Sequence, residues 1–275
     1  MRFQRELTAA VLIPIVLAIL IKAPTWAFAA LVGAATFVAL IEFCGLISAA
    51  GWVVPRTAVL LLFVGFLVAD FYSSLPVLVG LTGATLLILP TLVMFQKPDA
   101  QVLLPSAAAS VFATLYVATG ACAMIGLRAY SWQAVLFVLV VVWAGDSAAY
   151  YAGRKFGKKK LAPVVSPKKT WEGFWGQLAG GMLLGGLYVA VIPRTVSEGS
   201  SLGNVALAVA IALVLSVVAV IGDLVESTFK RSSGVKDSGG LLPGHGGLLD
   251  RLDSLLYSAP FVLLLVTVFP GALPR

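Results

Sequence analysis

Charged residues are scarce in this chain. Of its 275 residues, 11% are Asp, Glu, Lys or Arg, whereas a soluble domain carries about 25%. Histidine occurs once, and the two cysteines, Cys44 and Cys122, lie in apolar runs. With so few thiol and imidazole groups, the sequence argues against a disulfide framework and against a zinc site. Apolar residues make up 60% of the chain, which predicts an integral membrane protein.

Apolar stretches recur along the sequence, and most approach the roughly 20 residues with which a helix crosses a bilayer. They predict an all-α, polytopic membrane helical bundle of about nine transmembrane helices, with the two termini on opposite sides. The predicted spans are residues 7–22, 26–48, 56–70, 73–95, 105–127, 131–152, 174–193, 203–229 and 255–270.

The basic residues are distributed unevenly between the two sides of this arrangement. With the N-terminus in the cytoplasm, Lys22, Arg128, Arg194 and Arg275 fall outside, and the other 15 of the 19 Lys and Arg residues fall on the cytoplasmic side. Such an excess is typical of cytoplasmic loops. The pattern predicts a multi-pass protein of the cell inner (plasma) membrane with a cytoplasmic N-terminus.

The first span has an alternative interpretation as a signal peptide. Arg2 and Arg5 precede an apolar stretch, and Ala27-Phe28-Ala29 resembles a cleavage site. That site lies well beyond the apolar stretch, so we favour a retained helix.

Two long polar loops, residues 153–173 and 230–254, are predicted on the same cytoplasmic face, whereas the loops of the first half are short. We therefore expect one integrated membrane domain with two parts. Residues 1–127 form an N-terminal membrane scaffold, and residues 128–275 form the catalytic membrane region.

Acidic residues at membrane depth cost about 2.5–3.5 kcal/mol each on insertion scales, so each is a candidate for function. Asp70 lies at a span end and is expected to be solvated. Glu42 either pairs with another span or serves a site. Asp146 and Asp223 lie at matching depth below basic loops, which predicts a pocket just under the cytoplasmic surface. Its carboxylates either bind Mg²⁺ or pair with loop lysines.

A second pair of acids returns to the same face. Asp223, Glu226 and Lys230 share one helical face at i, i+3 and i+7, and Asp250 and Asp253 repeat the i, i+3 spacing where the next helix begins.

The loop 230–254 combines four cations with acids and glycines, and bare N–H groups of glycine turns bind phosphate oxygens. This composition favours metal-assisted phosphoryl or nucleotidyl transfer over a plain polar connector. We interpret His245 as a phosphate contact or a structural residue in preference to a general base. A phosphate monoester, with a second pKa near 6, is already largely anionic at neutral pH.

The loop 153–173 holds seven cations between Arg154 and Lys169. They either bind anionic headgroups or follow the positive-inside bias alone. Within this loop, hydroxyls and lysines precede Trp171, a predicted interfacial anchor. Glycines recur at four-residue spacing in the following span, which predicts close helix packing, internal or across a dimer.

The residues between Ser227 and Asp253 resemble the signature of the phosphatidate cytidylyltransferases. The matching residues are Ser227-x-Phe229-Lys230-Arg231, Lys236-Asp237 and Pro243-x-His245-Gly246-Gly247-Leu248-x-Asp250-Arg251-x-Asp253. Segments 145–160 and 166–173 are similar to the same family. The resemblance implies that CTP and phosphatidate give CDP-diacylglycerol and pyrophosphate with Mg²⁺, and that the chain forms a homodimer.

Pattern and resemblance together give the expected site. The metal ligands are Asp223 and Asp250, implied by the resemblance, with help from Asp146. The catalytic set is Asp223, Asp250, Lys230, Arg231, Lys236, Asp237, His245, Arg251 and Asp253. The substrate-binding set is Ser166, Lys168, Lys169, Thr170, Gly246 and Gly247. The expected partners are CTP, phosphatidate, membrane lipids and a second copy, with no nucleic acid.

Two rival functions stay open. A CTP-dependent kinase acting on a polyprenol-type lipid alcohol would transfer the γ-phosphate instead. A membrane transporter would place Asp146, Asp223 and Glu42 along an ion path, and discontinuous spans near the midplane would favour it.

Overall fold

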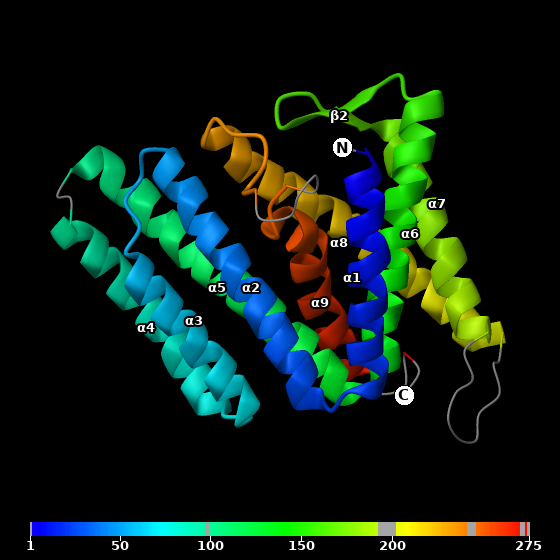
Figure 1. Ribbon diagram of the computed structural model, residues 1–275, viewed down its shortest axis with the longest axis horizontal. Helices are drawn as coiled ribbons and strands as arrows, with labels where there is room; N and C mark the ends of the chain where they lie inside the picture. The colour runs from blue at the N-terminus through cyan, green and yellow to red at the C-terminus, as the bar shows by residue number, and fades with distance from the viewer. Residues whose placement is uncertain (1, 97–98, 192–201, 241–245, 270–272, 274–275) are drawn as a thin grey trace. The chain divides into compact units, whose positions relative to one another are not determined.

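The computed structural model describes residues 2–96, 99–191, 202–240, 246–269 and 273. These residues form nine helices and one two-stranded sheet (Figure 1). In chain order the elements are α1 (Arg2–Lys22), α2 (Thr25–Ala49), α3 (Arg56–Phe71), α4 (Leu75–Gln96), α5 (Ala100–Tyr130), α6 (Trp132–Phe156), β1 (Lys160–Ala162), β2 (Ser166–Thr170), α7 (Trp171–Val191), α8 (Leu202–Ser232) and α9 (Leu249–Val268).

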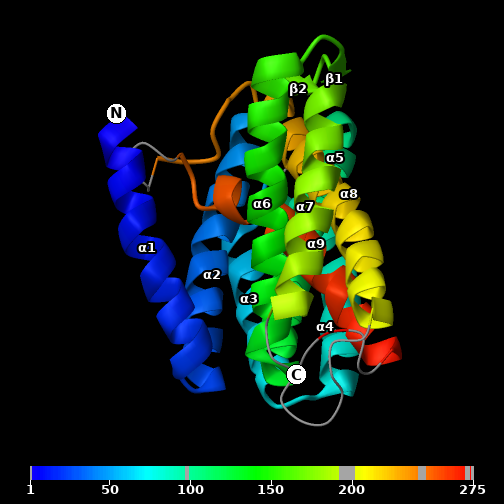
Figure 2. The ribbon, with the colours of Figure 1, turned by 90° about the vertical axis from the view of Figure 1, so that its right-hand side faces the viewer.

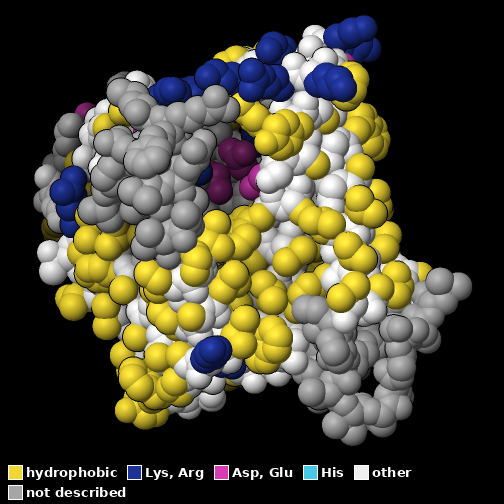
Figure 3. All heavy atoms as spheres, turned by 45° about the vertical axis from the view of Figure 1, so that its right-hand side comes forward, with side chains coloured by type: hydrophobic (Ala, Val, Ile, Leu, Met, Phe, Trp, Pro, Cys, Tyr) yellow, Lys and Arg dark blue, Asp and Glu magenta, His cyan; other side chains and the backbone are white. Residues whose placement is uncertain are grey.

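Helix length and surface chemistry both fit a membrane protein. Seven helices are long and apolar enough to cross a bilayer, whereas α3, with 16 residues, and the described apolar part of α1 are shorter. Large hydrophobic side chains stay exposed along the helices, and Figure 3 shows them over much of the described surface of one face. Such surface is costly in water and suits lipid. The predicted polytopic helical bundle is confirmed, while the count of nine crossings and the orientation stay predictions.

Several helix boundaries are set by local hydrogen bonds. The Ser131 hydroxyl accepts from the Ala134 amide at 3.0 Å and caps α6. Gly51, just past the end of α2, adopts φ +81°, a conformation that glycine takes without a steric penalty. These signals are readable in the sequence, and the helices begin and end close to the predicted spans.

Two predictions about the polar loops need correction. Within the helical fold, β1 and β2 form an antiparallel hairpin inside the segment 153–173, which was predicted as a loop. In addition, α8 continues to Ser232, so Lys230 and Arg231 are helical rather than part of a loop. Lysine and arginine are good helix formers, and their charge is favourable at a helix C-terminus.

The chain divides into two compact units. The first comprises residues 1–125 and 228–252, and the second comprises residues 126–227 and 253–275. The first break lies near the predicted boundary at 127, but most of the polar segment 230–254 belongs to the first unit. The functional division into scaffold and catalytic region stays a prediction.

Helices α6 and α7 lie side by side in the second unit (Figures 1 and 2). A Cβ added at Gly176 would lie 2.6 Å from the Ala152 Cβ, and one at Gly180 would lie 2.5 Å from the Ala148 Cβ. Farther along α7, a Cβ at Gly185 would lie 2.7 Å from the Ala212 Cβ of α8. Packing within the unit therefore accounts for the glycine spacing of α7.

Candidate functional site

Three carboxylates converge in the second unit. Asp223 and Glu226 lie one turn apart on α8, and Asp253 lies near the start of α9. One oxygen of each lies within 4.8 Å of the others. Glu226 is 3% exposed and Asp253 is 8% exposed. We call these three residues the acidic cluster.

Close approach of two helices brings the cluster together. A Cβ added at Gly222 would lie 3.1 Å from the Asp253 carbonyl oxygen and 2.7 Å from the Tyr257 Cβ. A larger side chain at this position would therefore push α8 and α9 apart. Gly222 directly precedes Asp223, so the local sequence of α8 supplies both the ligand group and the room beside it.

The hairpin adds a cation to the cluster. The Lys169 ammonium lies 2.7 Å from an Asp223 carboxylate oxygen. Neighbouring residues of a strand point to opposite faces, and Lys168 on β2 is exposed while Lys169 is half-buried. At the end of β2, the buried Thr170 hydroxyl accepts from the Gly173 amide at 3.1 Å, which caps α7 and fixes the hairpin to it. The expected pairing of Asp223 with a loop lysine is thus present.

The cluster suits a divalent cation. Carboxylates this close disfavour one another's charged forms, and burial of two of them adds to that cost. Lys169 offsets part of the negative charge. The remaining ligand set consists of oxygens, the donors that Mg²⁺ prefers in proteins. The composition of this described cluster therefore fits the predicted metal site, with Glu226 and Asp253 as members that the predicted ligand set did not include.

Asp250 lies in the first unit, surrounded by hydrogen-bond donors. Its Oδ1 accepts from the Lys230 ammonium at 2.6 Å, and both side chains are largely buried. Its Oδ2 accepts from the Ser238 amide at 2.9 Å and the Gly247 amide at 2.8 Å, and the Ser238 hydroxyl lies 3.0 Å from it. Its predicted role as a metal ligand stays a prediction, and a cation at Oδ1 would compete with Lys230.

Glu42 of α2 belongs to the same hydrogen-bonded group. Its Oε2 accepts from the Leu249 amide at 2.8 Å and from the Ser238 hydroxyl at 3.1 Å. Of the alternatives open for Glu42, the structure thus shows a pairing, with the segment before α9 and with the first residue of α9.

The other predicted residues occupy varied places. Asp146 is exposed on α6, and its Oδ1 accepts from Gln177 Nε2 at 3.1 Å. Arg231 is exposed and donates to the Val235 carbonyl at 3.3 Å. Ser166 begins β2, Gly246 has φ +80°, and Lys168, Lys236, Asp237 and Arg251 are exposed. His245 lies outside the described residues.

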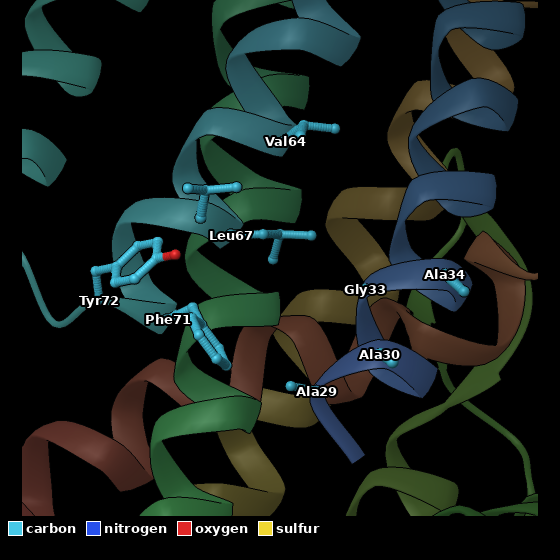
Figure 4. Close-up of a pocket in the computed structure, with 9 residues that line it drawn as sticks. Ala29, Ala30, Gly33, Ala34, Val64, Leu67, Phe71 and Tyr72 are labelled. Carbon is cyan, nitrogen blue, oxygen red and sulfur yellow. The ribbon is translucent and has the colours of Figure 1, made fainter. Parts of the chain in front are cut away.

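An apolar pocket of about 480 Å³ lies elsewhere in the first unit (Figure 4). Its nine lining residues come from α2, α3 and the residue after α3, and none of them is charged. Tyr72 supplies the one hydroxyl among them. Phosphate binding requires charge or clustered donors, so this pocket lacks the chemistry of the predicted reaction.

Fold and site together define a class: a helical membrane protein with an oxygen-only candidate cation site beside a lysine. The chain belongs to the cytidylyltransferase family, whose model matches residues 3–269.

Curated relatives carry the name phosphatidate cytidylyltransferase. That of Haemophilus influenzae is 49% identical over 128 residues, covering 46% of this chain and 43% of the relative. That of Bacillus subtilis is 45% identical over 143 residues, covering 52% and 51%. That of Brucella suis is 43% identical over 162 residues, covering 59% and 57%. The matched segment thus spans about half the length of these relatives.

Proposed function

We propose that the protein is a phosphatidate cytidylyltransferase, which transfers the cytidylyl group of CTP to phosphatidate in phospholipid biosynthesis. The products are CDP-diacylglycerol and pyrophosphate. The observation that carries this proposal is the match of the cytidylyltransferase family over residues 3–269, in a chain whose acidic cluster lies against a hairpin lysine. Relatives named for this reaction support the choice of substrates.

In the proposed reaction, a phosphate oxygen of phosphatidate attacks the α-phosphorus of CTP. A new P–O bond forms there, the bond from the α-phosphorus to the oxygen bridging the β-phosphorus breaks, and pyrophosphate leaves with that electron pair. The attacking phosphate is already anionic near neutral pH, so the step needs no general base. The protein's task is alignment and charge neutralisation.

Basic side chains are proposed to hold the phosphates. Lys168 on the hairpin, together with Lys236 and Arg251, is exposed and within reach of a soluble nucleotide. Lys169 and Lys230 each form an ion pair with a carboxylate. This pairing fixes the positions of their ammonium groups. Ser166, Arg231, Gly246 and Gly247 complete the proposed phosphate contacts, and His245 and Asp237 stay proposed members of the site.

Asp223, Glu226 and Asp253 are proposed to hold a divalent cation, Mg²⁺ being the one that their oxygens suit. Bound there, it would neutralise phosphate charge and favour departure of pyrophosphate. Asp250 and Asp146 stay proposed additional ligands. Lys169 would balance the charge of the cluster before the cation arrives.

The membrane setting follows from the chemistry of the substrates. Phosphatidate keeps its acyl chains in the bilayer while CTP arrives from water. We place the site on the cytoplasmic side of the bacterial inner membrane, with the N-terminus cytoplasmic and nine helices crossing. The positive-inside pattern supports this orientation. A homodimer is proposed as the functional unit.

The test is a transfer assay with purified protein, vesicles containing phosphatidate, Mg²⁺, and CTP labelled at either the α- or the γ-phosphorus. We expect α-label in the lipid and γ-label in released pyrophosphate, and the Asp223→Asn variant serves as the inactive control. Label entering a polyprenol-type lipid only from the γ position would contradict the proposal and favour the kinase. Solute movement without pyrophosphate release would favour a transporter.

A further inference from the structure

We propose that Glu42 is a positioning residue, which holds Ser238 and the first residue of α9 so that Asp250 and Lys230 keep their places. This inference rests on the proposed function for its kinetic readout but on the described contacts for its geometry. It gives a role in the reaction to a helix that the sequence assigned to the scaffold.

The contacts form a short chain from α2 to Asp250. A single oxygen of Glu42 accepts from the Leu249 amide at 2.8 Å and the Ser238 hydroxyl at 3.1 Å. That hydroxyl also lies 3.0 Å from Asp250 Oδ2, which accepts from the Ser238 amide. Glu42 therefore fixes Ser238, which is a binding partner of Asp250, and Leu249, which precedes Asp250 in the chain, although Glu42 has no contact with Asp250 in these bonds.

The glycines of this segment make room for the Glu42 carboxylate. A Cβ added at Gly239 would collide with Glu42 Oε1, and one at Gly247 would collide with the Ser238 hydroxyl and lie 2.5 Å from Glu42 Oε2. A Cβ at Gly240 meets nothing within 4 Å. At Gly239 the requirement for glycine thus follows the position of the carboxylate, and at Gly247 it follows both the carboxylate and the Ser238 hydroxyl.

The same part of α2 also anchors the end of α8. Phe43 packs edge-on against Phe229, with ring centroids 4.8 Å apart. The Ser233 hydroxyl donates to the Leu46 carbonyl at 2.7 Å. Within five residues, α2 therefore binds the end of α8 and, through Glu42, two later positions of the polar segment 230–254. This arrangement defines the distance that the segment must span.

A carboxylate suits this task because hydrogen bonds to an ionised acceptor are about twice as strong as neutral ones. Glu42 uses one oxygen as a double acceptor, and a glutamine carbonyl can do the same with weaker bonds. Leucine has a similar size and accepts none. The two substitutions therefore separate the acceptor from the charge.

The experiment compares Glu42→Leu, Glu42→Gln and the control Thr36→Val in full-length protein. Thr36 is buried on the same helix, and its hydroxyl binds only backbone carbonyls of α2 in the contacts described. We expect Glu42→Leu to lower kcat by about 10–100-fold, the range typical of supporting residues. The KM for phosphatidate should change less than kcat. Glu42→Gln should restore most of the activity, and Thr36→Val should match the parent.

The second readout is amide hydrogen exchange at Ser238 and Leu249 in vesicles, which does not depend on turnover. Both amides should exchange faster in Glu42→Leu and should be nearly unchanged in Glu42→Gln. Gly239→Ala, whose added Cβ would have Glu42 atoms as its nearest neighbours, should reproduce the faster exchange at Ser238, whereas Gly240→Ala should not. If Glu42→Leu does not fold, the glycine pair and Glu42→Gln still decide the matter.

The inference is overturned if Glu42→Gln loses as much kcat as Glu42→Leu, since the charge would then act directly. It is also overturned if Glu42→Leu or Gly239→Ala leaves both amides as protected as in the parent. If the parent protein fails to release pyrophosphate from CTP and phosphatidate, the proposed function fails while the exchange data still test the role of Glu42.

Discussion

The two units use carboxylates in different ways. In the first, Glu42 and Asp250 accept hydrogen bonds from a lysine, a hydroxyl and backbone amides. In the second, Asp223, Glu226 and Asp253 gather with their oxygens close to one another. Amide donors fix the conformation of the backbone that supplies them, whereas converging carboxylates create a demand for positive charge. The same chemical group thus fixes the backbone in one place and forms a candidate cation site in the other.

The two lysine–carboxylate pairs repeat this contrast. The side chains of Lys230 and Asp250 are 12% and 8% exposed, whereas those of Lys169 and Asp223 are 23% and 37% exposed. A buried pair is costly to break because the remaining charge stays out of water. A half-exposed pair can exchange its partner for solvent or ligand. The first pair is therefore suited to structure and the second to changes of charge during turnover.

The largest effect is expected from removing charge in the acidic cluster. Asp253→Asn and Glu226→Gln should each lower turnover at least about 100-fold, beyond the range usual for residues that only support a metal site. The readouts are pyrophosphate release and its dependence on Mg²⁺ concentration. Asp70→Asn, on α3 in the other unit, is the matched control and should stay within about twofold.

Comparison with Glu42→Gln makes this test sharper. Both substitutions remove a carboxylate charge while keeping the shape of the side chain. If the two units differ as described, Asp253→Asn loses far more turnover than Glu42→Gln. Equal losses would mean that the distinction between hydrogen-bonded and cation-binding carboxylates is wrong.

The second effect concerns the stability of the first unit. Lys230→Met leaves Asp250 without its ammonium partner and should reduce the free energy of unfolding by about 3–5 kcal/mol. Thermal or denaturant unfolding in detergent measures this loss. Adding Asp250→Asn to Lys230→Met should recover part of it, because the uncompensated charge is then gone. Equal stability of the single and double variants would count against a buried, coupled pair.

The smallest effect is expected at Lys169. Lys169→Met should lower stability by no more than about 1 kcal/mol, since the pair is half-exposed. It also removes a positive charge beside the cluster, so Mg²⁺ should activate the variant at concentrations up to about fivefold lower. The measurement is the Mg²⁺ concentration for half-maximal pyrophosphate release. A shift to higher concentrations would show that Lys169 assists the cation instead of competing with it.

Much of this arrangement could be predicted from the sequence. The lengths of the apolar runs determined the helices closely, because membrane spans must satisfy their backbone internally. The i, i+3 spacing of Asp223 and Glu226 placed them on one face. The β-hairpin was not predicted because a three-residue strand has too little periodicity to recognise among lysines and prolines. The continuation of α8 through Lys230 was not predicted, because the change from apolar to charged residues at this position was interpreted as the start of a loop.

The partners of Glu42 could not be predicted at all. They are the Leu249 amide and the Ser238 hydroxyl, about 200 residues away in sequence. Every residue except proline has a backbone amide, so the residue type at position 249 does not indicate this contact. Glu226 was placed on one helical face with Asp223, yet its place in the cluster depends on the approach of α9 at Gly222. Both features arise from tertiary contacts that no local pattern contains.

The strand β2, which precedes α7, places two consecutive lysines in different surroundings. Because β2 alternates its faces, Lys168 meets the solvent while Lys169 meets Asp223. Which lysine faces solvent depends on the number of residues between it and Thr170, which caps α7, and not on the lysine side chains, which are identical. Inserting one residue between Lys169 and Thr170 would reverse the parity of the strand and exchange the two. A shift of a single residue thus decides which lysine faces solvent and which contacts Asp223.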